Sequence, residues 1–159
     1  MVISPRLIAI ALVAACVSAL AAALTGQFVF GLRPCVLCHA QRVPFVLAAL
    51  LAAVSLRRSA SPSLGQLLIR LAGLVLLINA CIAFYHVGVE QHWWASAVCP
   101  ASNDGPLAVA DMLAELNRPA EVHCDQPQWS FHGITMAALN LPYSAGLGLL
   151  ALVLTRRNS

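Results

Sequence analysis

The sequence predicts an all-α integral membrane protein, a bundle of four transmembrane helices with a short first and a long second outer loop. Hydrophobic residues make up 60% of its 159 residues and charged residues only 9%, whereas a soluble domain has about 25% charged residues. Mean hydropathy is +0.83. Apolar runs of the length that a helix needs to cross a bilayer lie at about 7–30, 37–56, 67–85 and 134–154. We expect one integral membrane domain over 1–159.

The charged residues are distributed unevenly along the chain. All six acids lie between residues 90 and 125, while arginines flank the apolar runs on one side of the predicted bundle. Cytoplasmic ends of transmembrane helices carry the excess of positive charge, so we expect both termini to be cytoplasmic and the loop of about 86–132 to lie outside. The lipid bilayer is the expected partner, and nucleic acid is not. The flanking arginines are Arg6, Arg57, Arg58, Arg70, Arg156 and Arg157.

The first apolar run follows Arg6 and contains several alanines, so it also resembles a secretory signal peptide. It is longer than an ordinary signal-peptide core, and its removal would leave the next three spans without a partner. We therefore expect the run to be retained as the first transmembrane helix.

The second apolar run begins at a C-x-x-C pair, Cys35 and Cys38. Pro34, just before the pair, suits the start of a helix because its missing N–H would have no helical partner there. Pro44 lies inside the run and removes one backbone hydrogen bond. The helix is therefore either kinked at Pro44, or regular only from about Arg42 onward.

The third run contains one strongly polar residue, Asn79. Amide side chains in transmembrane helices usually bond a neighbouring helix, and we expect this of Asn79. In the outer loop, residues 104–117 are predicted to form a short helix, packed on the protein or lying in the membrane interface. Tryptophans of the loop fit an aromatic belt at the outer membrane boundary. They are Trp93, Trp94 and Trp129.

The C-x-x-C pair shares a helix face with a cation. At 100° per residue, Cys35, Cys38 and Arg42 fall within about 60° of one another. A thiol at a helix N-terminus beside a cation has a lowered pKa, and the thiolate is the species that exchanges disulfides. Arg42 keeps its charge in a protein and could hold a thiolate or an anion that develops on an acceptor. The alternative for Arg42 is a snorkelling residue at the interface.

A second pair of cysteines, Cys99 and Cys124, lies in the outer loop, where disulfides persist. A bond between them would close a loop of about 26 residues and stabilise the fold by roughly 3 to 4 kcal/mol. Alternatively, this pair exchanges with the first and relays electrons from a soluble thiol protein into the membrane. Four outer cysteines allow three pairings. Cys16 and Cys81 lie inside predicted spans, where we expect them only to pack.

Two sets of residues resemble the pattern of a known family. The first set is Cys35, Val36, Leu37, Cys38, Gln41, Arg42, Val43 and Pro44. The second set is Tyr85, His86, Glu90, Cys99, Cys124, Trp129, Phe131 and Gly133. Both are similar to the DsbB family of membrane quinone-dependent thiol oxidases, and the resemblance covers nearly the whole chain.

The resemblance implies a bacterial inner-membrane enzyme that reoxidises a soluble, periplasmic DsbA-like protein of thioredoxin fold. Two electrons then pass through two cysteine pairs to a membrane quinone, either ubiquinone or menaquinone. In this scheme Cys99 forms the mixed disulfide with the partner, and Cys124 is the disulfide mate of Cys99. The sequence has no dinucleotide-binding fingerprint, which is consistent with a lipid-soluble acceptor.

The same resemblance assigns roles around the first pair. Cys35 and Cys38 take the electrons, with Cys38 as the thiolate that meets the quinone. Arg42 polarises the quinone oxygen, and His86 is expected near the same site. His86 and Glu90 stand at i and i+4 if the third helix continues outward, and they could form an ion pair or relay protons.

Three alternatives stay open at this point. Cys35, Cys38 and His39 form the string C-x-x-C-H, the attachment signal of c-type haem, which would indicate a membrane cytochrome. A non-catalytic scaffold protein would need neither pair for its function. Zinc binding is the third alternative, by histidines and cysteines whose spacing matches no compact pattern. These are His86, His92, Cys99, His123, Cys124 and His132.

Overall fold

A computed structural model of the chain describes residues 4–57, 61–99 and 122–156. Within these residues, four helices are long and apolar enough to cross a membrane, which confirms the predicted all-α membrane bundle. The helix predicted at 104–117 lies outside the described residues. The four helices are α1 (Pro5–Phe28), α2 (Val36–Ser55), α3 (Pro62–Glu90) and α5 (Met136–Arg156).

Local sequence explains where the helices begin. α1 and α3 both start at a Ser-Pro step, in which the serine hydroxyl accepts a backbone N–H of the first turn and the proline occupies the first helical position. α2 begins at Val36 and is continuous through Pro44, with Cys35 as its N-cap. Of the two alternatives given for Pro44, a regular helix that begins only near Arg42 is wrong, because the Cys35 side chain caps a first turn at Val36.

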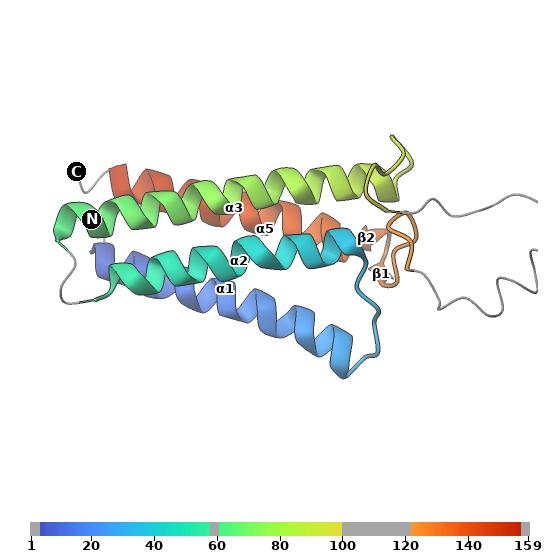
Figure 1. Ribbon diagram of the computed structural model, residues 1–159, viewed down its shortest axis with the longest axis horizontal. Coiled ribbons are helices and arrows are strands. Elements are labelled where there is room, and N and C mark those ends of the chain that lie inside the picture. The colour runs from blue at the N-terminus through green and yellow to red at the C-terminus, as the bar shows by residue number, and fades with distance from the viewer. Residues whose placement is uncertain (1–3, 58–60, 100–121, 157–159) are drawn as a thin grey trace, which may run out of the picture.

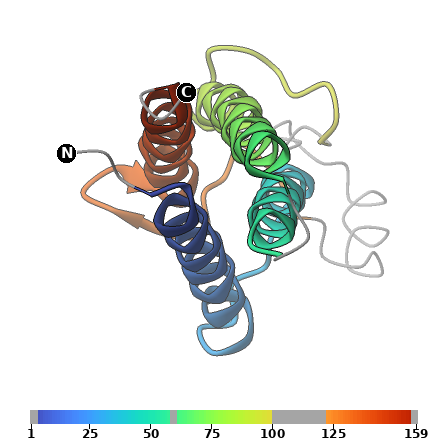
Figure 2. The ribbon, with the colours of Figure 1, turned by 90° about the vertical axis from the view of Figure 1, so that its left-hand side faces the viewer.

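The helices stand side by side around a ring in the order α1, α2, α3 and α5 (Figures 1 and 2). α3 packs most extensively against α5 and α2, and α1 packs mainly against α2. α1 begins and α5 ends at the same end of the bundle (Figure 1). The N-terminus of α2, which carries the C-x-x-C pair, lies at the opposite end.

Small residues let the helices approach closely, as is typical of membrane bundles. Ala48 of α2 and Ala72 of α3 are fully buried in the core, which also holds Cys16 of α1. Gly73 and Gly148 bring α3 and α5 together, since a Cβ added at Gly148 would lie 2.8 Å from the carbonyl oxygen of Gly73. Large apolar side chains are exposed along the outer faces of all four helices, where lipid would cover them.

Asn79 confirms the expected bond to a neighbouring helix, because its Nδ2 donates to Ser144 Oγ of α5 at 2.9 Å. α3 continues beyond the predicted end of its span, from Tyr85 to Glu90. The expected start of the last span, Ile134, belongs instead to a short hairpin before α5. Strands β1 (Ser130–Phe131) and β2 (Ile134–Thr135) pair antiparallel across it.

The hairpin turn consists of His132 and Gly133, both with positive φ (51° and 80°). A two-residue turn with positive φ at both positions matches the twist of the flanking strands. The hairpin sets the start of α5 and places Thr135 next to the outer end of α3, where its hydroxyl meets Glu90.

Candidate active site

Cys35 and Cys38 meet at the first turn of α2. Cys35 is the N-cap residue, and its Sγ accepts the backbone N–H of Cys38 at 3.3 Å. The same capping geometry brings the two side chains together, with the sulfur atoms 3.0 Å apart. Both residues are thiols in the structure, with Cys35 buried and Cys38 half-buried.

The surroundings of Cys35 favour its thiolate. The hydrogen bond from the Cys38 thiol lowers the pKa of Cys35 most strongly, burial of the sulfur raises it, and His86 Nε2 at 3.6 Å lowers it further. The pKa of Cys35 is lowered overall, as expected for a sulfur at a helix N-terminus. These contacts therefore stabilise an anion on the Cys35 sulfur when the pair is reduced. The role expected for Cys38 toward an acceptor stays a prediction.

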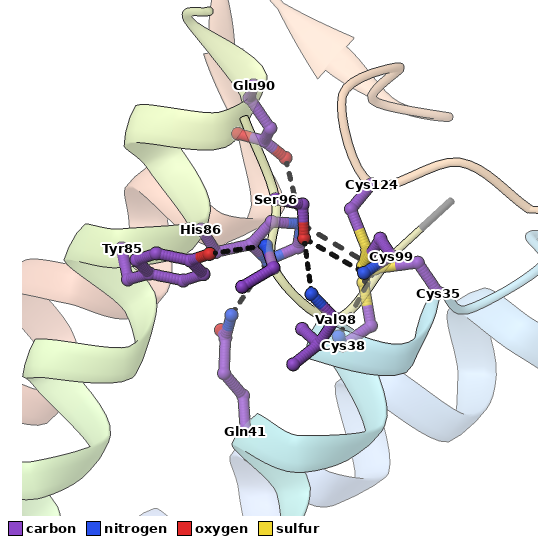
Figure 3. The surroundings of a disulfide bond; sticks show 11 residues. Cys35, Cys38, Gln41, Tyr85, His86, Glu90, Ser96, Val98, Cys99 and Cys124 are labelled. Carbon is purple, nitrogen blue, oxygen red and sulfur yellow. Dashed lines mark hydrogen bonds and ion pairs between the residues drawn. A yellow bond between two sulfur atoms is a disulfide. The ribbon is translucent and has the colours of Figure 1, made fainter. Parts of the chain in front are cut away.

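The second pair, Cys99 and Cys124, forms a disulfide with 6.0 Å between the Cα atoms. Both residues are buried together with Cys35, Leu37 and Val89. Figure 3 shows the disulfide directly beside the first turn of α2. The sulfur atoms of Cys35 and Cys124 lie within 4.8 Å of each other. The fold therefore brings both predicted cysteine pairs into one site.

The segment that carries Cys99 is fixed on the C-terminal end of α3. Trp94 stacks on Tyr85 with ring centroids 6.0 Å apart, and its Nε1 donates to the Tyr85 carbonyl oxygen at 3.2 Å. The Tyr85 hydroxyl accepts the backbone N–H of Ala97 at 3.0 Å, and Ser96 Oγ accepts that of Cys99 at 3.0 Å. These contacts fix the segment up to Cys99 on α3 and so hold the disulfide near α2.

His86 and Glu90, predicted at i and i+4, do meet on α3. His86 Nε2 lies 3.7 Å from Glu90 Oε1, and Thr135 Oγ1 donates to Glu90 Oε2 at 2.5 Å. The other ring nitrogen of His86, Nδ1, lies 2.8 Å from Gln41 Nε2 on α2. His86 is only 3% exposed. It links the first cysteine pair to Gln41 of α2 and to Glu90 of α3.

A cavity of about 580 Å³ opens next to the first cysteine pair, between α1, α2 and α5. Its walls are mostly apolar, and Cys35, Cys38 and Arg42 all line it, as does His86. The volume is in the range of small-molecule and cofactor sites. Arg42 reaches across to α1, where Nη1 donates to Gln27 Oε1 at 2.6 Å and Nη2 to the Ala23 carbonyl oxygen at 3.4 Å. The predicted face of α2 thus faces a cavity.

Comparison with known proteins decides the family. A model of the family described as "Disulfide bond formation protein DsbB" matches residues 5–154. The chain belongs to the DsbB family. Two curated DsbB relatives named disulfide bond formation protein B are similar over most of their length. The protein from Chromohalobacter salexigens is 30% identical, covering 89% of this chain and 88% of its own. That from Polaromonas sp. is 29% identical, covering 96% and 92%. The comparison with solved structures found no match.

Of the residues considered for haem or zinc binding, some lie in this site and others do not. His39 is exposed and does not line the cavity, although it completes the haem-like string. Of the zinc candidates, His86 and Cys124 come together with Cys35, while His92 and His132 are exposed. Cys124 is bonded to Cys99 and not available as a thiolate. Membership of the DsbB family makes the chain a disulfide bond formation protein.

Sequence reasoning missed several polar residues of this DsbB site. Gln27 contacts Arg42, and Asn140 Nδ2 donates to Gln41 Oε1 at 2.5 Å. In the sequence, Gln41 stands out only as part of the family pattern. All three are polar residues within apolar runs, the same signal that singled out Asn79. A search of every span for strongly polar residues would identify all three. Trp129, expected in an aromatic belt, lines the cavity.

Proposed function

We propose that the protein oxidises the dithiol of a soluble, periplasmic DsbA-like protein of thioredoxin fold and delivers the two electrons to a membrane quinone. The chain would lie in the bacterial inner membrane with both termini in the cytoplasm and both cysteine pairs on the periplasmic side. The arginines at the end of the bundle opposite the cysteines support this orientation.

The observation that carries this proposal is the continuous series of four sulfur atoms. The Cys99–Cys124 disulfide lies in the outer loop, Cys124 Sγ is within 4.8 Å of Cys35 Sγ, and Cys35 Sγ is 3.0 Å from Cys38 Sγ. Cys38 in turn lines the apolar cavity. Thiol–disulfide exchange needs a thiolate that can reach a disulfide sulfur, and this arrangement places Cys124 within reach of the first pair.

The exchange steps balance in atoms and electrons. The partner's thiolate attacks Cys99 and releases Cys124, and the partner's second thiol then releases Cys99, so that the partner leaves as a disulfide. The reduced Cys99 and Cys124 next transfer two electrons to a Cys35–Cys38 disulfide. Their own disulfide is restored, and the first pair becomes the dithiol that the structure shows.

The residues around the cavity fit a quinone as the acceptor. A bound quinone would accept two electrons and two protons. The mostly apolar walls suit a lipid-soluble ring, and Arg42 offers guanidinium donors for a ring oxygen beside Cys38. We assign Arg42, Cys38 and His86 to quinone binding, and Cys35, Cys38, Cys99 and Cys124 to the electron transfer.

The test is to mix the purified protein with a reduced DsbA-like partner and a soluble quinone analogue, and to follow quinone absorbance. We expect turnover in the wild type and near-complete loss in Cys38→Ser. Cys81→Ser is the matched control, because Cys81 lies on an exposed face of α3 away from the site. Equal rates in the wild type and Cys38→Ser would refute the mechanism.

The same preparations separate the remaining alternatives. A scaffold protein would keep its function in Cys35→Ser and Cys38→Ser, whereas the oxidase loses it in both. A c-type cytochrome would show a haem spectrum after reduction and treatment with alkaline pyridine, and the oxidase would not. Metal analysis of the purified protein tests zinc binding in the same way.

A further inference from the structure

A chain of hydrogen bonds runs through the interior of the bundle and ends at the first cysteine pair. It begins at Asn79 of α3, whose Nδ2 donates to Ser144 Oγ at 2.9 Å. Ser144 Oγ donates to Asn140 Oδ1 at 2.8 Å, and Asn140 Nδ2 donates to Gln41 Oε1 at 2.5 Å. Gln41 Nε2 then lies 2.8 Å from His86 Nδ1. The chain joins α3, α5 and α2.

The direction of these bonds determines which nitrogen of His86 carries the proton. Because Gln41 Oε1 accepts from Asn140, the atom that faces His86 is the amide nitrogen. An amide nitrogen can only donate, so His86 Nδ1 must be the acceptor. The proton of the neutral ring is therefore on Nε2, which lies 3.6 Å from Cys35 Sγ and 3.7 Å from Glu90 Oε1. Figure 3 shows His86 between Gln41 and the cysteines.

We propose that Gln41 and Asn140 are positioning residues that hold His86 in the Nε2–H tautomer, so that its N–H points at the sulfur of Cys35. The opposite tautomer would present a lone pair to that sulfur and disfavour its anion. Aligned hydrogen bonds polarise one another in a low-dielectric interior, so Asn140 acts on Cys35 without touching it. The catalytic meaning of this arrangement rests on the proposed function, but the tautomer itself does not.

Other groups around Cys35 also affect its ionisation. These are the Cys38 thiol on α2, the Glu90 carboxyl on α3 and the Cys99–Cys124 disulfide from the outer loop. We expect them to stay in place when Gln41 or Asn140 is replaced by an apolar residue of similar size. A change in the pKa of Cys35 in such variants would therefore be caused by a change at His86.

The experiment uses the full-length reduced protein in detergent, without quinone or partner. Nitrogen NMR of ¹⁵N-histidine-labelled protein shows which ring nitrogen is protonated, and a His86→Phe sample identifies the His86 signals. In parallel, the rate of Cys35 alkylation by iodoacetamide is followed against pH, with the site identified by peptide mass spectrometry. The variants are Gln41→Met and Asn140→Leu. Ser55→Ala is the control, because it removes a side-chain hydrogen bond at the far end of α2.

In the wild type and Ser55→Ala we expect the proton on Nε2. In Gln41→Met and Asn140→Leu we expect a mixture of tautomers, and a rise of about one pH unit in the midpoint of Cys35 alkylation, which corresponds to the loss of one hydrogen bond. In a His86→Phe background, Gln41→Met should cause no further rise. A proton on Nδ1 in the wild type, or unchanged midpoints in both variants, would overturn the proposal.

These outcomes are independent of turnover. If the wild type fails to reduce quinone but shows the expected tautomer and midpoints, the proposed function fails and the positioning role stands. If the wild type turns over normally but the tautomer is the other one, the positioning role alone is refuted.

Discussion

Cys35 and Cys124 place their sulfur atoms within 4.8 Å of each other, although one residue caps a transmembrane helix and the other lies in the loop before the last helix. Neither residue is bonded to the other in the structure. Their proximity means that the two cysteine pairs can exchange a disulfide without rearrangement of the helices.

This proximity predicts a trapped disulfide. In the double variant Cys38→Ser, Cys99→Ser, the thiols of Cys35 and Cys124 lose their own partners and face each other. Under mild oxidation we expect an intramolecular Cys35–Cys124 bond, detected by non-reducing peptide mass spectrometry. A variant that keeps Cys81 and Cys124, with the other three site cysteines replaced by serine, is the control and should not crosslink within one chain. Free Cys124, or bonds only between chains, would contradict the arrangement.

Because Arg42 lines the cavity, we expect the substitution Arg42→Lys to weaken quinone binding. Lysine keeps the positive charge but lacks the planar fork that contacts Gln27 and the Ala23 carbonyl oxygen. We expect the KM for a soluble quinone to rise about tenfold, equivalent to roughly 1.4 kcal/mol of binding. Reduction of the Cys99–Cys124 disulfide by a small dithiol should be unaffected. Arg57→Lys, at the far end of α2, is the control, and an equal rise there would count against the cavity as the quinone site.

The lowered pKa of Cys35 predicts a pH profile for the reduced protein. A lowered pKa means that the thiolate persists below the ordinary cysteine value of about 8.5. Alkylation of Cys35 by iodoacetamide should therefore stay fast as the pH falls below that value. The ionised sulfur should stabilise the reduced fold above the ordinary pKa, and this stabilisation should be lost as the pH falls through the folded-state pKa.

Replacing the hydrogen-bond donor tests the cause of this shift. Cys38→Ala removes the donor that lowers the pKa of Cys35 most strongly, so the alkylation midpoint should move to higher pH. The Cys35→Ser protein gives the background rate of alkylation at the other cysteines. A wild-type midpoint near about 8.5, or one that does not change in Cys38→Ala, would show that the cap does not stabilise the thiolate.

A substitution at Gly88 tests whether the packing of Trp94 holds the outer loop in place. A Cβ at this position would overlap the indole ring of Trp94, so Gly88→Ala should displace Trp94 from Tyr85 and loosen the segment that carries Cys99. We expect a change in tryptophan fluorescence and faster reduction of the Cys99–Cys124 disulfide by small thiols. Helix propensity alone favours alanine by about 1 kcal/mol.

Gly65→Ala is the matched control on the same helix, because a Cβ there makes only an ordinary contact with the Ser55 carbonyl oxygen. It should leave both readouts unchanged. If the two alanine variants behave alike, the packing of Trp94 on Gly88 does not hold the loop.

The sequence alone determined the class of this protein and one face of its site. Hydropathy identified the four spans because a helix in lipid must be apolar over a bilayer's thickness. The helical period of 100° per residue placed Cys35, Cys38 and Arg42 together because those residues belong to one helix. Hydropathy did not find the end of α3 at Glu90, since the helix continues where its residues become polar.

Only the tertiary structure decided what faces these residues. Cys35 approaches Cys124, and His86 approaches Gln41, from different elements of the chain. The periodicity within one helix does not specify how that helix is rotated, or shifted along its axis, relative to another element. These approaches depend on close packing, as where Gly73 meets Gly148, and on the hairpin that sets the start of α5. The tautomer that we propose for His86 likewise depends on tertiary contacts, because the hydrogen-bond chain that reaches its ring through Gln41 includes side chains of α2, α5 and α3.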